Sequence, residues 1–326
     1  MIESKIKLDF VKLEKALLAL EVMAYKPMQE DRGNIDATIQ RFEFTIELFW
    51  KLLKHILESK GVQVQYPKDI LKEAYKGYLI DLDGTVYKGA ERIPTAEIFV
   101  KELQDKNIPF LFVTNNATKT AAEVKENLLK NFQIDVTEDH IYTSAMAALD
   151  HLSEWNIGKK VLVIGEASLK QEVQSAGFEM VDEHPDFVLQ ALDRGVTYQQ
   201  LEAACLAIQQ GAKFVATNPD TNLPTERGFI PGAGALTAFL KACTQKEPLI
   251  IGKPYPTNMA GAIKRMKLEK DEVIMVGDNY NTDILAGVHY GVDTLMVLTG
   301  FSQRVDIEGK DEQPTYIVKD LSEWEV

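Results

Sequence analysis

The first 75 or so residues follow a helical pattern of apolar positions. Between residues 3 and 25, apolar side chains recur at steps of three and four, which places them along one face of a helix. Pro27 ends this predicted helix, and a second one runs over residues 35–60. Pro67 opens a shorter third helix that reaches about Tyr75. In the second helix, three aromatic side chains are expected in the core of the helical segment: Phe42, Phe49 and Trp50.

The pattern changes after residue 77. Short apolar runs now predict strands over residues 78–80, 109–114, 160–164, 187–192, 214–217, 249–251, 273–276 and 294–297. Helical patterns occupy most of the intervals, at residues 95–106, 120–131, 144–154, 168–176, 198–210, 234–244, 257–266 and 281–291. This alternation predicts an α/β fold, a doubly wound, Rossmann-like parallel sheet with helices on both faces, preceded by an all-α segment.

Composition and charge narrow the class of protein. The chain has 326 residues with 45% hydrophobic and 26% charged residues, values typical of a globular protein of two or three domains. No apolar run reaches the roughly 20 residues of a membrane helix, and the first residues lack the apolar core of a signal peptide, so we expect a cytoplasmic protein. Residues 1–77 carry a net charge of +1 and the remainder −14, which argues against nucleic-acid binding by the larger part.

Two carboxylates follow the first predicted strand. Asp81 and Asp83 belong to the run Asp81-Leu82-Asp83-Gly84-Thr85, directly after Tyr78-Leu79-Ile80. Because ligands bind at the carboxyl ends of parallel strands, both side chains can point into one pocket. One carboxylate can attack phosphorus and form an aspartyl-phosphate, and the other can give a proton to the leaving oxygen and later take one from water. The run therefore predicts a catalytic loop for the hydrolysis of phosphate esters.

Two further clusters can bind phosphate. Thr114-Asn115-Asn116 follows the strand over residues 109–114, and its hydroxyl and backbone N–H groups can contact phosphate oxygens. Lys253 stands between Gly252 and Pro254, directly after the strand over residues 249–251. Its ammonium group can neutralise the phosphate and the attacking carboxylate together.

A fourth cluster can bind a metal ion. Asp278 follows the strand over residues 273–276, and Mg²⁺ prefers hard oxygen ligands of this kind. Asp278 can hold the ion together with Asp81 and the backbone carbonyl of Asp83. Asp283, five residues further on, can orient a metal-bound water or Lys253, or it can cap a helix.

In this order, the four clusters resemble the motifs of the haloacid dehalogenase superfamily, and the resemblance covers residue 77 to the end of the chain. It implies that Asp81 is the nucleophile and Asp83 the acid and base. It implies that Thr114, Asn115 and Lys253 hold the phosphate. It also implies that Asp278 binds Mg²⁺ with Asp81 and Asp83, supported by Asp283. A phosphotransferase or phosphomutase of the same superfamily is the alternative, since it passes the phosphoryl group to another acceptor.

The long interval between Thr114 and Lys253 leaves room for a cap over the active site. Within and beside it, the runs Leu192-Asp193-Arg194, Thr217-Asn218-Pro219-Asp220 and Pro231-Gly232-Ala233-Gly234 resemble the NagD or 4-nitrophenyl-phosphatase branch. That branch implies an inserted α/β cap and small phosphomonoester substrates, such as sugar, glycerol or nucleoside monophosphates and p-nitrophenyl phosphate. It makes three cap residues candidates for contact with the leaving group: Asp193, Arg194 and Asn218.

Residues 1–76 resemble a different family, the HEPN-like substrate-binding proteins that accompany nucleotidyltransferases. The run from Ile39 to Lys51 carries the resemblance, but the pattern stops at Lys76-Gly77, and the Arg–His pair of the nuclease members does not follow. We therefore expect a fusion of a truncated helical bundle with a phosphatase. An apolar face of such a bundle would need a partner: the phosphatase itself, a second copy in a homodimer, or a nucleotidyltransferase in a toxin–antitoxin module.

The sequence thus predicts three domains. The helical segment occupies residues 1–76, the catalytic core residues 77–143 and 233–326, and the cap residues 144–232.

Overall fold

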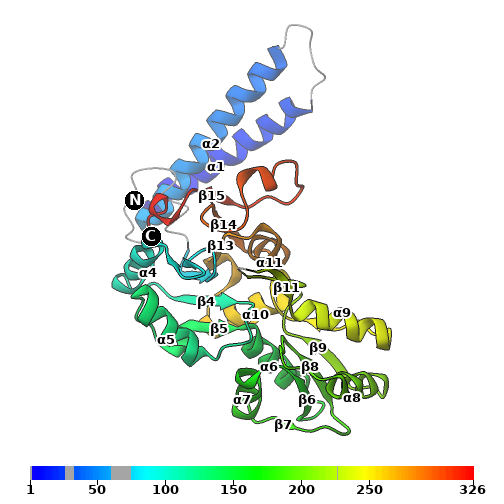
Figure 1. Cartoon of the computed structure of the whole chain (residues 1–326). Coiled ribbons are helices and arrows are strands. Elements are labelled where there is room, and N and C mark those ends of the chain that lie inside the picture. The colour runs from blue at the N-terminus through cyan, green and yellow to red at the C-terminus, as the bar shows by residue number, and fades with distance from the viewer. Residues whose placement is uncertain (1, 26–32, 60–74, 226) are drawn as a thin grey trace. The chain divides into compact units, whose positions relative to one another are not determined.

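The computed structural model describes residues 2–25, 33–59, 75–225 and 227–326 (Figure 1). It divides into two compact units, Met1–Tyr75 and Lys76–Val326.

The first unit is a pair of long helices, α1 (Ile2–Ala24) and α2 (Gly33–Ser59), as the sequence predicts. Leu13, Leu48 and Leu52 form its buried core. Asp9 is also buried and its carboxylate lies 2.6 Å from His55 Nδ1. The predicted third helix, residues 67–75, falls almost entirely outside the described residues.

The expectation that the aromatic residues of α2 form the core is wrong for Phe42 and Phe49, whereas Trp50 is half-buried in this unit. The side chain of Phe42 is 55% exposed and that of Phe49 is 37% exposed. Two helices bury only the narrow strip along which they face each other, and leucines fill that strip here.

The second unit contains a parallel six-stranded sheet with the order β15-β14-β13-β1-β4-β5. Its central strand, β1 (Gly77–Ile80), is fully buried between β13 (Val273–Gly277) and β4 (Phe110–Thr114). The outer strands are β14 (Asp293–Val297), β15 (Tyr316–Val318) and β5 (Ile141–Thr143). The helices of this part are α4 (Pro94–Asp105), α5 (Ala121–Phe132), α6 (Ser144–Trp155), α10 (Pro256–Met266) and α11 (Leu285–Tyr290).

A second parallel sheet has five strands in the order β12-β9-β8-β6-β7. Their bounds are β6 (Lys160–Ile164), β7 (Glu179–Met180), β8 (Phe187–Gln190), β9 (Lys213–Ala216) and β12 (Leu249–Ile250). The helices α7 (Ala167–Ser175), α8 (Tyr198–Gln209) and α9 (Ala233–Thr244) accompany it in the sequence. Its edge strand β12 lies outside residues 144–232, the predicted cap. One strand of this sheet therefore comes from the range that the sequence analysis assigns to the catalytic core.

The eight predicted strands are all present, with ends that differ by at most two residues. The sequence did not predict the short strands β5, β7 and β15, nor two antiparallel pairs, β2 (Tyr87–Lys88) with β3 (Glu91–Arg92) and β10 (Asn222–Thr225) with β11 (Gly228–Pro231). Each has only two to four residues, too few for a recognisable apolar pattern. The predicted helix over residues 281–291 is a π-helical turn, Tyr280–Ile284, followed by α11.

Within the described parts of the chain, we find no helix whose length and apolar character would let it cross a membrane.

Candidate active site

Lys253 joins two carboxylates that follow different strands of the six-stranded sheet. Its Nζ atom lies 2.5 Å from Asp81 Oδ1, just after β1, and 2.7 Å from Asp283 Oδ1, after β13. It also donates to the backbone carbonyl of Val113 at 2.8 Å. Lys253 is 1% exposed, so burial disfavours its charged form, but the carboxylates of Asp283 and Asp81 outweigh burial and raise the pKa of the lysine. The site therefore holds a fixed positive charge beside the Asp81 carboxylate.

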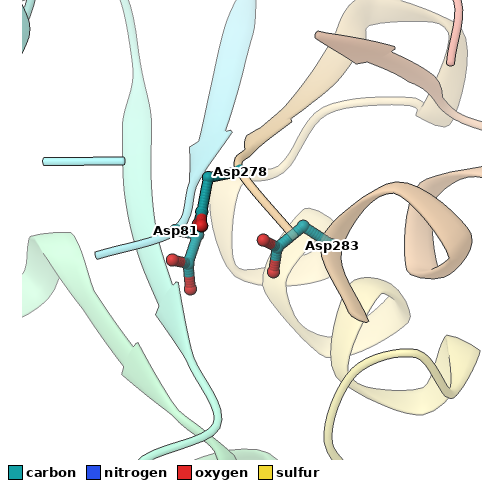
Figure 2. Close-up of side chains that lie close together, drawn as sticks. All are labelled: Asp81, Asp278 and Asp283. Atoms are coloured by element: carbon teal, nitrogen blue, oxygen red, sulfur yellow. The ribbon is translucent and has the colours of Figure 1, made fainter. Parts of the chain in front are cut away.

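Three carboxylates gather at the same sheet edge. Asp81, Asp278 and Asp283 each offer an oxygen atom, and these atoms lie within 4.8 Å of one another (Figure 2). Burial raises the pKa of Asp81 well above its usual value, and burial together with the Asp283 carboxylate raises the pKa of Asp278 to about 7. A single lysine does not balance three buried carboxylates. A divalent cation would balance their remaining charge, and a donor set made only of oxygen atoms fits Mg²⁺.

Asp83 occupies a different position from its neighbour. Its side chain is exposed, and its Oδ1 atom accepts a hydrogen bond from the Gly89 backbone at 3.0 Å. The third carboxylate beside those of Asp81 and Asp278 is that of Asp283. The carboxylate of Asp83 therefore lies at the surface, outside the buried group of carboxylates.

Asp283 does not cap a helix, so the capping alternative is wrong. It lies inside the π-helical turn, and Asn279 holds the N-terminal position, where its side chain accepts from the Asn281 backbone. Asp283 Oδ2 accepts from the Asn279 backbone at 3.0 Å, which leaves Oδ1 for Lys253.

The catalytic loop closes tightly around Asp278. Gly84 has φ +98°, and a Cβ atom there would overlap the Asp278 carboxylate, so the loop requires glycine at this position. Thr85 Oγ1 donates to Asp278 Oδ1 at 3.3 Å. These contacts fix the Asp278 carboxylate, from the fourth cluster, against the loop Asp81–Thr85, which is the first cluster.

The segment after β14 completes this arrangement, and the sequence analysis did not identify it. The Phe301 backbone donates to Asp278 Oδ2 at 2.6 Å, and Thr299 Oγ1 donates to the Gly84 carbonyl at 2.6 Å. A Cβ atom on Gly300 would overlap Asp278. The signal was available, because Thr299-Gly300-Phe301-Ser302 is a polar, glycine-containing run just past a strand, like the four clusters that were recognised.

Asn115 and Asn218 meet beside Lys253. The Asn115 side chain bonds to the backbone of Lys253, and Asn218 Nδ2 donates to the Asn115 carbonyl at 2.9 Å. Asp220, which the sequence analysis did not select as a site residue, lies 3.4 Å from Asn115 Nδ2. Thr114 is buried, and its hydroxyl accepts from the Asn116 backbone at 3.2 Å.

The other two cap candidates have local partners. Arg194 pairs with Glu166 at 2.7 Å, and Asp193 accepts from the Gly195 backbone at 2.9 Å. No hydrogen bond or ion pair found among the described residues links either side chain to the Asp81 cluster.

Comparison with known proteins identifies the family. Residues 78–179 match the model of haloacid dehalogenase-like hydrolases, and residues 250–324 match a related hydrolase-like model. Residues 8–93 match the nucleotidyltransferase substrate-binding protein-like family, which supports a fusion.

Similar proteins are known as phosphatases. The chain is 43% identical to the 5′-nucleotidase YutF of Bacillus subtilis over 252 residues, which cover 77% of this chain and 98% of that protein. It is 47% identical to an acid sugar phosphatase of Staphylococcus epidermidis, with coverage of 76% and 96%. The solved structure of NagD from E. coli K-12 is 35% identical, covers 77% of this chain and 98% of its own, and has a TM-score of 0.73.

The motifs, the geometry around Asp81 and these relatives agree. The chain belongs to the haloacid dehalogenase-like hydrolases, and it is a phosphatase of the branch that contains NagD.

Proposed function

We propose that this chain hydrolyses small phosphomonoesters with the help of Mg²⁺, through an aspartyl-phosphate formed on Asp81. The observation that carries the proposal is the buried contact of Lys253 with Asp81 beside Asp278 and Asp283. The names of the relatives support sugar and nucleoside monophosphates as substrates. Glycerol phosphate and p-nitrophenyl phosphate are of similar size and belong to the same proposal.

In the first step, an oxygen of the Asp81 carboxylate attacks phosphorus, and the bond between phosphorus and the leaving oxygen breaks. Lys253 neutralises charge on the phosphoryl oxygens, and Thr114, which follows the Val113 carbonyl that accepts from Lys253, contributes its hydroxyl. Asp83 gives its proton to the leaving oxygen. The leaving alcohol departs, and the phosphoryl group stays on Asp81.

In the second step, Asp83 takes a proton from a water molecule, and that water attacks phosphorus. The bond between phosphorus and Asp81 breaks, which releases inorganic phosphate and restores both carboxyl groups. Mg²⁺, held by Asp81, Asp278 and the Asp83 carbonyl, would neutralise charge and keep Asp81 ionised. Because phosphate monoesters hydrolyse so slowly in water, the site must lower the barrier by roughly 20 kcal/mol.

The segment over residues 144–232 is proposed as the cap that covers this site. A cap excludes bulk water and contacts the leaving group. Asn218 stands nearest to the catalytic residues, through Asn115. Asp193 and Arg194 would act at the rim, and Arg194 would first have to leave Glu166.

A phosphate-release screen tests the proposal. Purified chain is incubated with Mg²⁺ and a panel of phosphorylated metabolites, with and without EDTA. We expect phosphate release that EDTA stops and added Mg²⁺ restores. Transfer of the phosphoryl group to an added alcohol or sugar, with little free phosphate, would favour the phosphotransferase alternative.

A second candidate function concerns residues 1–76. The family match over residues 8–93 favours a binding module, and α1 and α2 expose large apolar side chains, among them Phe10, Leu17 and Phe44. A hollow of about 310 Å³ between these helices is lined by apolar side chains such as Phe44 and Leu48, with Lys12, Lys15 and Arg41 beside them, which suits an apolar partner surface that also carries acidic groups. A second copy of the chain or a nucleotidyltransferase would fill this role. Co-purification that is lost when residues 1–75 are deleted would support it, and a monomer that captures no nucleotidyltransferase would exclude it.

A further inference from the structure

The side chain of Asn115 forms two hydrogen bonds with the backbone of Lys253. Its Nδ2 atom donates to the Lys253 carbonyl at 2.9 Å, and its Oδ1 atom accepts from the Lys253 N–H at 2.8 Å. One side chain thus satisfies the donor and the acceptor of a single residue. Because both ends of the carboxamide are engaged in this way, its main partner is the lysine backbone and not a bound phosphate.

The backbone of Asn115 extends the connection. Its carbonyl accepts from Asn218 Nδ2 at 2.9 Å and from Ser144 Oγ at 2.7 Å. Four stretches of chain therefore meet at one residue: the end of β4, the start of α6, the segment after β9, and the segment after β12.

Gly252 makes this close approach possible. A Cβ atom at that position would lie 2.6 Å from Asn115 Oδ1 and 2.6 Å from the Thr217 carbonyl, which is far inside van der Waals contact. The Gly252 N–H also donates to that carbonyl at 2.8 Å. The glycine before the lysine thus leaves room for the carboxamide of Asn115.

The location of Lys253 shows why such a clamp matters. The lysine follows β12, which pairs with β9 in the five-stranded sheet, whereas Asp81 and Asp283 follow strands of the six-stranded sheet. Its ammonium group must reach across from one sheet to the other. Asn115 belongs to the same sheet as Asp81, through β4, and it fixes the lysine backbone relative to that sheet.

We propose that Asn115 is a positioning residue, which places the Lys253 ammonium group for phosphate binding. The inference rests on the proposed phosphatase function. It assigns the side chain of Asn115 a role through the lysine, in place of the direct phosphate contact expected from the motif. Misplacement of a charged group by about 1 Å is enough to lower activity by about 100-fold.

The test measures the affinity of the Mg²⁺-loaded, full-length protein for inorganic phosphate by calorimetry. Because it does not depend on turnover, it works even in inactive variants. Asn115→Ala is expected to weaken phosphate binding by about 10- to 100-fold, because a misplaced ammonium group loses a hydrogen bond to the charged phosphate, with little change in the Mg²⁺ affinity. Asn115→Asp keeps the size of the side chain but places an oxygen against the Lys253 carbonyl and the Asp220 carboxylate, so it should weaken phosphate binding and lower the melting temperature, and circular dichroism at the assay temperature checks that the variant is folded. Asn131→Ala, an exposed asparagine on α5, is the matched control and should change neither quantity.

A double-mutant cycle decides between the two roles of Asn115. If Asn115 acts through the lysine, then Asn115→Ala should change phosphate binding less than about twofold when Lys253→Ala is already present. Effects that multiply would mean that Asn115 contacts phosphate independently, and they would overturn the proposal. Unchanged phosphate affinity in both Asn115 variants would also overturn it. Failure of the proposed function has a different signature, since the wild-type protein itself would then release no phosphate from p-nitrophenyl phosphate.

Discussion

Lys253 Nζ lies 2.5 Å from Asp81 Oδ1, although the two residues follow strands of different sheets. The lysine is fully buried, and its ammonium group also contacts Asp283. The positive charge that the reaction needs is therefore supplied where two sheets meet.

Asp278→Asn should stabilise the metal-free protein and abolish its response to Mg²⁺. Burial and the Asp283 carboxylate raise the pKa of Asp278 to about 7, so its charge is unfavourable without a cation. At pH 8 in EDTA, we expect the free energy of unfolding of the variant to exceed that of the wild type by about 2 kcal/mol. Thermal melting with EDTA and with Mg²⁺ measures both effects. A variant that keeps the wild-type Mg²⁺ shift would remove Asp278 from the metal site.

Asp83→Ala should slow the enzyme most with poor leaving groups. In the proposed mechanism, the exposed carboxylate two residues after Asp81 protonates the leaving oxygen, a contribution of about 10²- to 10⁴-fold. p-Nitrophenolate leaves without a proton, so the loss for p-nitrophenyl phosphate should be smaller than for an alkyl phosphate. Steady-state rates on both substrates give the comparison. Equal losses on the two would argue against Asp83 as the acid.

Ionisation of Glu172 should make the second unit, Lys76–Val326, less stable as the pH rises. Burial raises the pKa of this carboxyl to about 7, against 4.5 as its usual value, and its Oε2 atom has no hydrogen-bond partner among the described residues. Between about pH 4.5 and pH 7 the folded state holds a proton that the unfolded state has lost, so stability falls across this window. The loss should be on the order of 2 kcal/mol.

Glu172→Gln removes this titration and serves as the measurement. Its melting temperature relative to the wild type should rise between pH 5 and pH 8, because only the wild type loses stability there. A difference that stays constant over this range would contradict the assignment.

Removal of residues 1–75 should leave an active phosphatase. The contacts of the chain divide it at Tyr75, and all residues of the Asp81 cluster belong to the second unit. Limited proteolysis between residues 61 and 77 should release a stable fragment with the kcat of the full chain. A fragment that unfolds or loses activity would mean that the two units depend on each other.

The sequence predicted the parts of the site that lie next to long apolar strands. Asp81, Lys253 and Asp278 each follow a run of apolar residues, and the end of a parallel strand is where such side chains converge. Short strands such as β5 and β15 gave no pattern, so the width of the core sheet could not be predicted. The periodicity of apolar residues does not indicate which strands are neighbours in a sheet. For this reason the sequence did not predict that β12 belongs to the second sheet.

Contacts between distant segments were beyond the sequence for the same reason. Asn115 and Lys253 are 138 positions apart, and no local sequence pattern indicates that the Asn115 carboxamide forms hydrogen bonds with the Lys253 backbone. The loop Thr299–Ser302 supports Asp278 through a backbone N–H, which any residue type at Phe301 could provide. Such roles become visible only when the fold brings the segments together.

The central claim is that Asp81 carries the phosphoryl group. The most direct measurement is acid quenching of the enzyme during turnover of p-nitrophenyl phosphate with Mg²⁺, followed by mass spectrometry of the peptide that contains Asp81. We predict one added phosphoryl group on this peptide in the wild type, and neither adduct nor phosphate release in a folded Asp81→Asn variant. Substantial turnover by Asp81→Asn, or a phosphoryl group on another residue, would contradict the account.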